Sequence, residues 1–233
     1  MRRIGAIAGG PATLAELLAD LLGPDSTFVV PAFTARNSTT TRRFRSLTRG
    51  MTREQVAAEE ARIPGFDRLT TPAQDVGAFA EFIRGHPGSL RSDHPQTSFA
   101  ALGPGASELL ADHALDCHLG EKSPLAKLYA ANALVVLIGV GFGVCSCFHL
   151  AEHRLSTPAP RRGYRCYVQE GGRRVLREFV AVDADDRDFT RLGEAMKDEP
   201  FVCRGRLGGA EVHWFPLRRA VEFAIARLPG RPA

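Results

Sequence analysis

The run Ala133-Leu-Val-Val-Leu-Ile138, followed after a glycine-rich turn by 146–153, has the pattern of a buried strand that leads into a helix. Residues 134–150 contain no Asp, Glu, Lys or Arg, and glycines at 139, 141 and 143 divide them. The divided run is marginally short for a membrane span, so a strand, a turn and the next helix explain it better. This stretch therefore favours a globular α/β protein.

Helices and short strands are also predicted on the N-terminal side of this run. Thr13-Leu-Ala-Glu16 has the capping-box pattern, and leucines at helical spacing follow it as far as Leu22. Further helices are expected from Thr52, from Thr71-Pro72, over 107–113 and from Ser123-Pro124 to Tyr129, and a strand is expected over 27–33. Residues 34–50 show no period and are predicted to form a loop.

Two hairpins and two helices are expected on the C-terminal side. Gly171-Gly172 and Gly208-Gly209 each separate two alternating runs, and helices are predicted over 186–197 and 216–228. Because strands and helices are interleaved, we expect an α/β fold with a mixed central sheet and helices on both faces. We expect one domain, spanning residues 1–233.

The composition limits the class of protein. The formal net charge is +4, and the arginines are spread in pairs, so a nucleic-acid surface is not expected. The five cysteines contain no CxxC pair, which predicts reduced thiols in a cytoplasmic protein and no metal site. The apolar N-terminal run is interrupted by Gly9-Gly10-Pro11 and carries Glu16 and Asp20, so it is not a signal peptide.

The stretch Arg91-Ser-Asp-His-Pro-Gln-Thr-Ser-Phe-Ala-Ala-Leu-Gly103 contains the first candidate catalytic residue. Proline at 95 disfavours helical backbone at His94, so this histidine is expected on a loop, where catalytic groups concentrate. A neutral imidazole takes up a proton near neutral pH, and Asp93 could orient the ring. A loop histidine bonded to backbone groups explains the same pattern.

Three weaker signals lie elsewhere. Gly9-Gly10 before a helix suits a phosphate site, because glycine lets the backbone approach and the helix N-terminus offers free N–H groups; a plain turn is the alternative. Glu121 stands just before a helix start, where it is either functional or a helix cap. His149 and Glu152 are three residues apart on one helical face, which favours a structural or substrate-facing pair over a metal site.

Taken together, these motifs resemble the aminoglycoside N(3)-acetyltransferase family. The resemblance covers nearly the whole chain and rests on five runs in order: Ile-Gly-Ala-Ile-Ala-Gly-Gly-Pro (4–11), Gly-Pro-Asp-Ser-Thr-Phe-Val-Val-Pro-Ala-Phe-Thr (23–34), the His-Pro run (91–103), Leu-Gly-Glu-Lys-Ser-Pro-Leu (119–125) and Phe-His-Leu-Ala-Glu (148–152). The His-Pro run and the Gly-Glu-x-Ser-Pro element are the most specific. The family also has a strand with a Val-His-Ser-Ser-like end before the position of Met1, and that strand is not in this sequence.

The resemblance implies an acyltransferase with a three-layer α/β/α fold that moves an acetyl group from acetyl-CoA to the 3-amino group of an aminoglycoside antibiotic. It implies direct transfer, with His94 as the general base and Glu121 as its catalytic partner. The residues expected to bind the cofactor are Ile4, Gly5, Ala6, Ile7, Gly9, Gly10, Ser98 and Ser123. The residues expected to bind the substrate are Asp67, His149 and Glu152. The expected partner is a small amine, without nucleic acid or membrane, and the expected assembly is a monomer or homodimer.

Two alternatives remain open from the sequence. The charge of +4 is unusual for a protein that binds a polycation, so the acceptor could be a different amine. Gly143 stands where relatives often carry Asp or Asn, and the family's first strand is not present. A truncated, non-catalytic remnant that binds CoA is therefore the second alternative.

Overall fold

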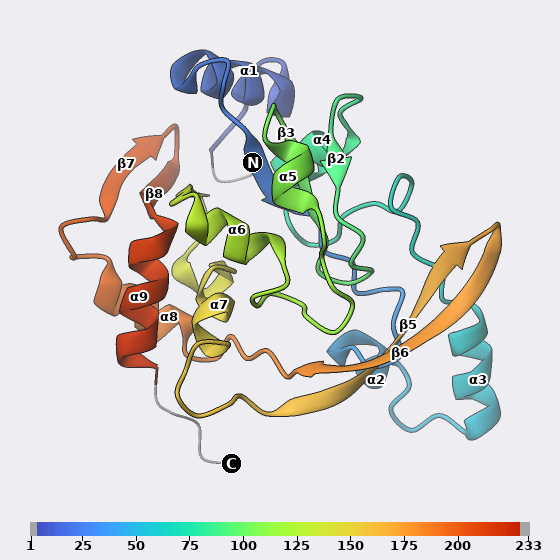
Figure 1. The fold of residues 1–233 in the computed structure, drawn as a ribbon. Helices are drawn as coiled ribbons and strands as arrows, with labels where there is room; N and C mark the ends of the chain where they lie inside the picture. Colours follow the sequence, from blue (N-terminus) through green and yellow to red (C-terminus); the bar gives the residue numbers. More distant parts are fainter. Residues whose placement is uncertain (1–3, 229–233) are drawn as a thin grey trace. The chain divides into compact units, whose positions relative to one another are not determined.

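The computed structural model describes residues 4–228, which form two compact units. Unit 1 consists of 4–26, 119–160 and 182–228, and unit 2 consists of 27–118 and 161–181. Each unit combines helices with strands, and the predicted α/β class is confirmed (Figure 1). Among the described residues, no helix combines the length and apolar character needed to cross a bilayer.

Unit 1 is built on a three-stranded antiparallel sheet with the order β4-β8-β7. The strands are β4 (Leu134–Ile138), β7 (Cys203–Leu207) and β8 (Ala210–Pro216). Its helices are α1 (Gly10–Leu22), α6 (Pro124–Ala130), α7 (Phe148–Glu152), α8 (Phe189–Met196) and α9 (Leu217–Arg227), with a 3-10 turn over Phe142–Val144. Fully buried side chains in its core include Phe148, Leu150, Met196 and Phe215.

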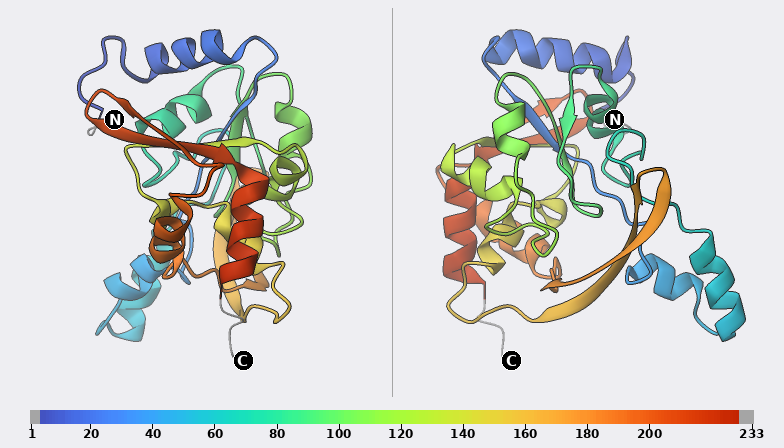
Figure 2. Two further views of the ribbon diagram at one scale, coloured as in Figure 1. Left: turned by 90° about the vertical axis from the view of Figure 1, so that its left-hand side faces the viewer. Right: turned by 45° about the vertical axis from the view of Figure 1, so that its right-hand side comes forward.

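Unit 2 contains a second antiparallel sheet, with the order β1-β3-β2, and a long hairpin. The sheet consists of β1 (Phe28–Pro31), β2 (Leu90–Arg91) and β3 (Phe99–Leu102), and helices α4 (Ala78–Gly85) and α5 (Ala106–Leu110) pack against it. Strands β5 (Arg161–Glu170) and β6 (Arg173–Val182) form the hairpin. Helices α2 (Arg42–Leu47) and α3 (Arg53–Ala61) lie beside the hairpin (Figures 1 and 2).

Locally determined elements agree with the sequence. Thr52 and Gln55 form the predicted capping box at the start of α3. Ser123 caps α6, with Pro124 at its first position. Both glycine pairs lie at hairpin turns, where Gly171 has φ +55° and Gly208 has φ +56°. Glycine adopts this left-handed backbone without the penalty that a Cβ imposes.

Other predictions are corrected. The Thr13 capping box is absent, because α1 begins at Gly10 with Pro11 in its first turn, where proline fits. The helix expected from Thr71 begins only at Ala78, and part of the loop predicted over 34–50 folds as α2. The strands form three separate sheets, and the two three-stranded sheets are antiparallel, so the described strands do not form one mixed sheet.

The strand from which the fold was read, β4, is less buried than its composition predicts. It lies at one end of its sheet, and Leu134 and Val136 are 53% and 43% exposed. A run of apolar residues indicates β structure but does not tell a central strand from an edge strand. The expectation that residues 1–233 form one domain stays a prediction, since the described residues form two compact units.

Candidate active site

A histidine and a carboxylate meet on α7 of unit 1. His149 and Glu152 are three residues apart on this helix, and Nδ1 of the histidine lies 2.7 Å from Oε2 of the glutamate. The Glu152 side chain is 2% exposed and that of His149 14%. Because a carboxylate only accepts hydrogen bonds, Nδ1 carries the proton and the lone pair of the neutral ring lies on Nε2.

Asp185, which precedes α8, and Phe189, the first residue of α8, contact this pair. The backbone N–H of Asp185 donates to Oε1 of Glu152 over 3.4 Å. The rings of Phe189 and His149 pack with their centroids 4.6 Å apart, and Phe189 is 1% exposed. The carboxylate therefore orients the imidazole from one side and an aromatic ring packs against it. This is the arrangement in which a carboxylate fixes the tautomer of a catalytic histidine.

The glycine turn of unit 1 leaves backbone accessible before α1. Gly5, Gly9 and Gly10 have φ values of +98°, +76° and +66°, and Gly9 is the N-cap residue. No side chain caps the helix, and Gly5, Ala6 and Gly9 are exposed. Of the amides at this end of the 13-residue helix, that of Gly10 donates to the Ile7 carbonyl and Pro11 has none, so an anionic group would meet the remaining N–H groups of the turn. The turn thus suits a phosphate-bearing cofactor.

Glu121 and Ser123 of unit 1 make local contacts. Arg154 donates from Nε and Nη2 to the two oxygens of Glu121, over 2.6 and 3.0 Å, and these bonds hold the pKa of the carboxyl below its usual value. The Ser123 hydroxyl donates to the Gly120 carbonyl and accepts from the Leu125 amide, and it is 2% exposed. In this conformation, both side chains stabilise the segment that leads into α6.

His94 belongs to unit 2 and is 1% exposed. Its Nδ1 accepts hydrogen bonds from the backbone amides of Gln96 and Thr97, over 3.2 and 3.1 Å. An Nδ1 that accepts two N–H groups is unprotonated, so the neutral ring carries its proton on Nε2. The lone pair of His94 is therefore already occupied by backbone donors. Asp93 does not orient this ring, because it pairs with Arg68 at 3.0 Å.

Two further histidines, which the sequence did not single out, surround His94. The ring centroids of His113 and His118 lie 4.8 and 4.5 Å from that of His94. Burial, followed by repulsion from His118 and His113, lowers the pKa of His94 well below its usual value, although the Leu115 carbonyl opposes this. No group of three or more His, Cys, Asp or Glu side chains in 4–228 is arranged to hold a metal ion.

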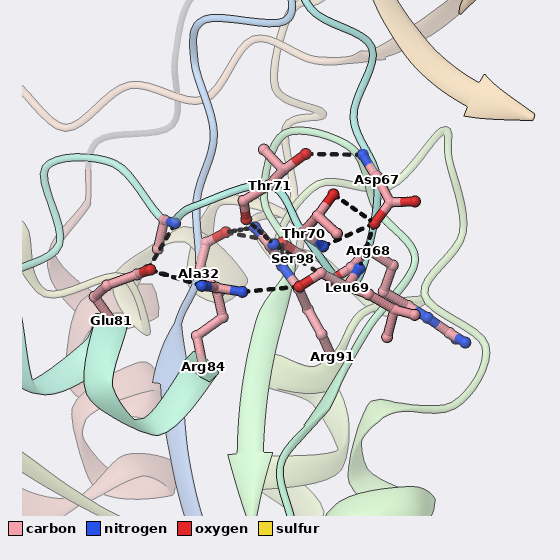
Figure 3. A network of polar contacts seen from close by, with 11 residues as sticks. Ala32, Asp67, Arg68, Leu69, Thr70, Thr71, Glu81, Arg84, Arg91 and Ser98 are labelled. Carbon is pink, nitrogen blue, oxygen red and sulfur yellow. Dashed lines mark hydrogen bonds and ion pairs between the residues drawn. The ribbon is translucent and has the colours of Figure 1, made fainter. Parts of the chain in front are cut away.

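Ser98 and Asp67 of unit 2 belong to a polar network around Arg91 (Figure 3). The fully buried Ser98 hydroxyl donates to the Ala32 carbonyl over 2.8 Å and accepts from Nε of Arg91 over 3.0 Å. Oδ1 of Asp67 accepts from the amides of Leu69 and Thr70, and the Thr70 bond is the largest cause of its lowered pKa. Both side chains are thus engaged within unit 2 in this conformation.

Arg91 itself was not identified from the sequence. It is 7% exposed, donates from Nη2 to the Ala32 carbonyl over 2.6 Å, and lies 4.9 Å from the Phe66 ring centre. Burial lowers its pKa to about 10. The bonds to backbone carbonyls tie β1 and the segment before α4 to β2, so Arg91 organises the loop on which His94 lies.

The family model of aminoglycoside 3-N-acetyltransferases matches residues 1–229. The chain belongs to this family. The family consists of acyltransferases whose acetyl donor is acetyl-CoA, so the chain is an enzyme of the acyltransferase class. The resemblance seen in the sequence is confirmed.

Similar proteins include curated relatives and solved structures. An aminoglycoside N(3)-acetyltransferase VII of Streptomyces paromomycinus is 32% identical over 97% of this chain and 82% of its own length. The prophage-derived acetyltransferase-like protein YokD of Bacillus subtilis is 35% identical over 70% of this chain, and the match covers 60% of that relative. The crystal structure of YokD superposes with a TM-score of 0.86, at 29% identity, over 96% of this chain and 82% of that one.

A structure of AAC-IIIb as a binary complex with CoASH superposes with a TM-score of 0.83, at 26% identity, and covers 100% of this chain and 89% of that one. AAC-VIa bound to sisomicin superposes with a TM-score of 0.82, at 27% identity, over the same shares of the two chains.

Proposed function

We propose that this protein transfers the acetyl group of acetyl-CoA directly to the 3-amino group of an aminoglycoside, with His149 as the general base. The observation that carries the proposal is the His149–Glu152 pair, in a chain whose family consists of acetyl-CoA-dependent acyltransferases. The names of its relatives support the acceptor, and the complex of AAC-IIIb with CoASH supports the donor. The free thiols of all five cysteines support a cytoplasmic location.

Direct transfer places a defined demand on the base. The nitrogen of a neutral amine attacks the thioester carbonyl carbon, a C–N bond forms, the C–S bond breaks and CoA leaves as its thiolate. The nitrogen must lose a proton, which the base takes and the thiolate finally receives. Nε2 of His149 has a lone pair for this proton, and the buried Glu152 carboxylate stabilises the imidazolium that results.

The hydrogen bonds of His94 favour His149 over His94 in this role. The accepting nitrogen of His94 is occupied by the amides of Gln96 and Thr97, and burial disfavours its protonated form. In His149 the nitrogen that bonds to Glu152 is Nδ1, so this bond leaves the lone pair of Nε2 unoccupied. We assign His94 to the folding of its loop, and the base role first predicted for His94 remains open to direct test.

The residues predicted to bind the cofactor and the substrate also differ in whether their polar groups are already bonded within the chain. The exposed glycines of the turn before α1 fit the phosphates or the pantetheine amides of acetyl-CoA, with backbone N–H groups as donors. Ser98 and Ser123 fit less well, because their hydroxyls are buried and bonded locally. Glu121, bound by Arg154, supports the segment before α6. Asp67 as a substrate ligand would require the Thr70 bonds to its carboxylate to open.

The test is an assay of the purified chain with acetyl-CoA and a panel of aminoglycosides. Release of the CoA thiol gives the rate, and mass spectrometry and NMR locate the acetyl group on the product. Acetylation at the 3-amino group supports the proposal. Absence of acetylation with every aminoglycoside, by a chain that binds acetyl-CoA, contradicts it.

A different amine acceptor is the second candidate, and charge is the observation that favours it. Aminoglycosides are polycations, whereas this chain has a formal charge of +4 and a sequence pI near 9.0. A positive protein repels a polycation and slows its association. Transfer to a neutral or acidic amine, with none to aminoglycosides, would select this candidate.

A further inference from the structure

Two cysteine sulfurs lie close together directly before α7, within unit 1. Sγ of Cys145 and Sγ of Cys147 are 3.2 Å apart, and both thiols are free. The two residues are buried, with exposed fractions of 1% and 4%. The sulfurs of a disulfide are about 2 Å apart, so these two need to approach by only about 1 Å to form one.

Tight turns of the backbone place the two side chains against each other. The amide of Cys145 donates to the Phe142 carbonyl over 2.9 Å, and the amide of Phe148 donates to the Cys145 carbonyl over 3.1 Å. Cys147 has helical backbone angles, whereas Cys145 has φ −76° and ψ 89°. The chain therefore changes direction at Cys145, which brings two side chains that are two positions apart to the same side.

The two thiols share a hydrogen bond. The bond to Cys145, followed by burial, raises the pKa of the Cys147 thiol well above its usual value. Cys147 thus keeps its proton and donates it to the sulfur of Cys145, which assigns the first reaction with an oxidant to Cys145, because the thiolate is the nucleophile. The segment also borders solvent, since Val144 is 65% exposed and Ser146 is half-buried.

The cysteine pair is connected to the candidate base through the backbone. The amide of His149 donates to the carbonyl of Ser146, which lies between the two cysteines, and the amide of Leu150 donates to the Cys147 carbonyl, each over 3.2 Å. Cys147 is also the N-cap residue of α7. A change of backbone in this segment therefore moves the first turn of α7, and a displacement of about 1 Å in an active site can lower the rate about 100-fold.

We propose that Cys145 and Cys147 form a reversible disulfide on exposure to hydrogen peroxide, and that this bond lowers acetyl transfer by displacing His149. The effect on catalysis rests on the proposed function, whereas the formation of the disulfide does not. Disulfides in cytoplasmic proteins are usually transient and act in catalysis or redox sensing. A dithiol that is reduced in the resting enzyme fits the second of these roles.

The reaction has two steps. The thiolate of Cys145 attacks one oxygen of the peroxide, the O–O bond breaks, and a sulfenic acid and one water form. The sulfur of Cys147 then attacks the sulfenic sulfur, the S–S bond forms, the S–O bond breaks and a second water leaves with the thiol proton. The two thiols together lose two electrons and two protons, and the peroxide is reduced to two waters.

Mass spectrometry tests whether the bond forms. Trypsin cuts after Lys127 and Arg154, so both cysteines lie in the peptide 128–154, which contains no other cysteine. After peroxide treatment and alkylation in denaturant, this peptide should be two hydrogen atoms lighter than its reduced form and carry no alkyl group. Dithiothreitol should restore both thiols. A peptide that is alkylated twice, or that carries oxygen on a single sulfur, would overturn the proposal.

Acetyl transfer tests the consequence for catalysis. Peroxide should lower the rate of the wild type by about tenfold or more, and dithiothreitol should restore it. Cys145→Ala and Cys147→Ala each keep a small apolar side chain and should respond little to peroxide. Cys203→Ser, which removes an exposed cysteine outside the pair, is the matched control and should respond as the wild type does. Equal losses of activity in Cys145→Ala and the wild type would contradict the proposal.

A readout without an acceptor separates this proposal from the proposed function. The NMR signals of the His149 imidazole, assigned by their loss in His149→Gln, should shift when the disulfide forms. This shift is expected even if the chain acetylates none of the amines tested, an outcome that would contradict the proposed function alone. Unchanged His149 signals in the fully oxidised protein would overturn the connection between the cysteine pair and the base.

Discussion

Nδ1 of His149 lies 2.7 Å from Oε2 of Glu152, one helical turn further along α7, and the carboxylate is almost completely buried. A buried carboxylate beside a neutral imidazole fixes which ring nitrogen is protonated. The bond thus turns the lone pair of Nε2 away from the carboxylate. The predictions below follow from this pair and from the contacts that support it.

Replacement of the Glu152 carboxylate by an amide tests whether the charge of this side chain, and not only its shape, is needed for catalysis. In Glu152→Gln the side chain keeps its size, but an amide stabilises the imidazolium less and also permits the other tautomer. We expect kcat to fall by about 10- to 100-fold with little change in the affinity for acetyl-CoA. Steady-state kinetics with calorimetry on the same preparation measure both. Equal kcat values for the variant and the wild type would remove Glu152 from the mechanism.

Buried His94 should make the folded protein sensitive to acid. Its pKa is lowered well below 6.5 in the folded state, so the unfolded chain binds a proton first as the pH falls. The free energy of unfolding should therefore be full above pH 6.5 and decrease below it, by up to about 1.4 kcal/mol per pH unit for this one group. Urea unfolding of the wild type and of His94→Gln, at several values between about pH 7.5 and about pH 5, measures how the free energy of unfolding of each protein changes with pH. Identical pH dependence in the two proteins would contradict the assignment.

Arg91 should be one of the most important side chains for the stability of unit 2. Its removal in Arg91→Met takes a donor from the Thr71 carbonyl, from the Ser98 hydroxyl and from the Ala32 carbonyl, which keeps only its bond from Ser98. We expect a loss of about 2 to 4 kcal/mol in the free energy of unfolding. Arg68→Met is the control, because Arg68 forms an ion pair in which both side chains are more than half exposed. That change should cost at most about 1 kcal/mol.

The packing of α8, whose Phe189 ring contacts His149, depends on a glycine. A Cβ at Gly193 would lie 1.9 Å from Cβ of Phe142, so Gly193→Ala must displace either the helix or the 3-10 turn. We expect a loss of about 1 to 3 kcal/mol and a reduced kcat, since α8 also supplies the Phe189 ring against His149. Gly85→Ala is the helical control, because nothing lies within 4 Å of its Cβ position. This change should be neutral or slightly stabilising.

Features that depend on neighbours in the chain could be predicted from the sequence. The Thr52 capping box, the Ser123 cap and the two glycine hairpins each involve residues a few positions apart. His149 and Glu152 were recognised as a pair for the same reason, since three residues make nearly one helical turn. The sequence predicted that this pair binds the substrate. Of the predictions made from the sequence, this one lies nearest to the base and carboxylate proposed above.

Features that depend on distant contacts could not be predicted. No local pattern shows that Phe189 packs against His149, or that Arg91 donates to the carbonyl of Ala32, which is 59 positions away. The same limit applies to His94. Its position before a proline was read correctly as a loop, but the packing of His113 and His118 around it follows from the tertiary fold. The sequence therefore located chemically suitable residues and predicted His94 as the base, but local patterns could not decide between His94 and His149.

The most direct test of the central claim is the value of kcat for His149→Ala, measured beside His94→Ala with the acceptor that the wild type acetylates. If His149 is the base, its removal should lower kcat by about 100-fold or more while the affinity for acetyl-CoA stays nearly unchanged. His94→Ala should act mainly on stability and retain a larger share of kcat. A His149→Ala enzyme with wild-type kcat, beside a folded His94→Ala enzyme that has lost it, would contradict the account and return the base role to His94.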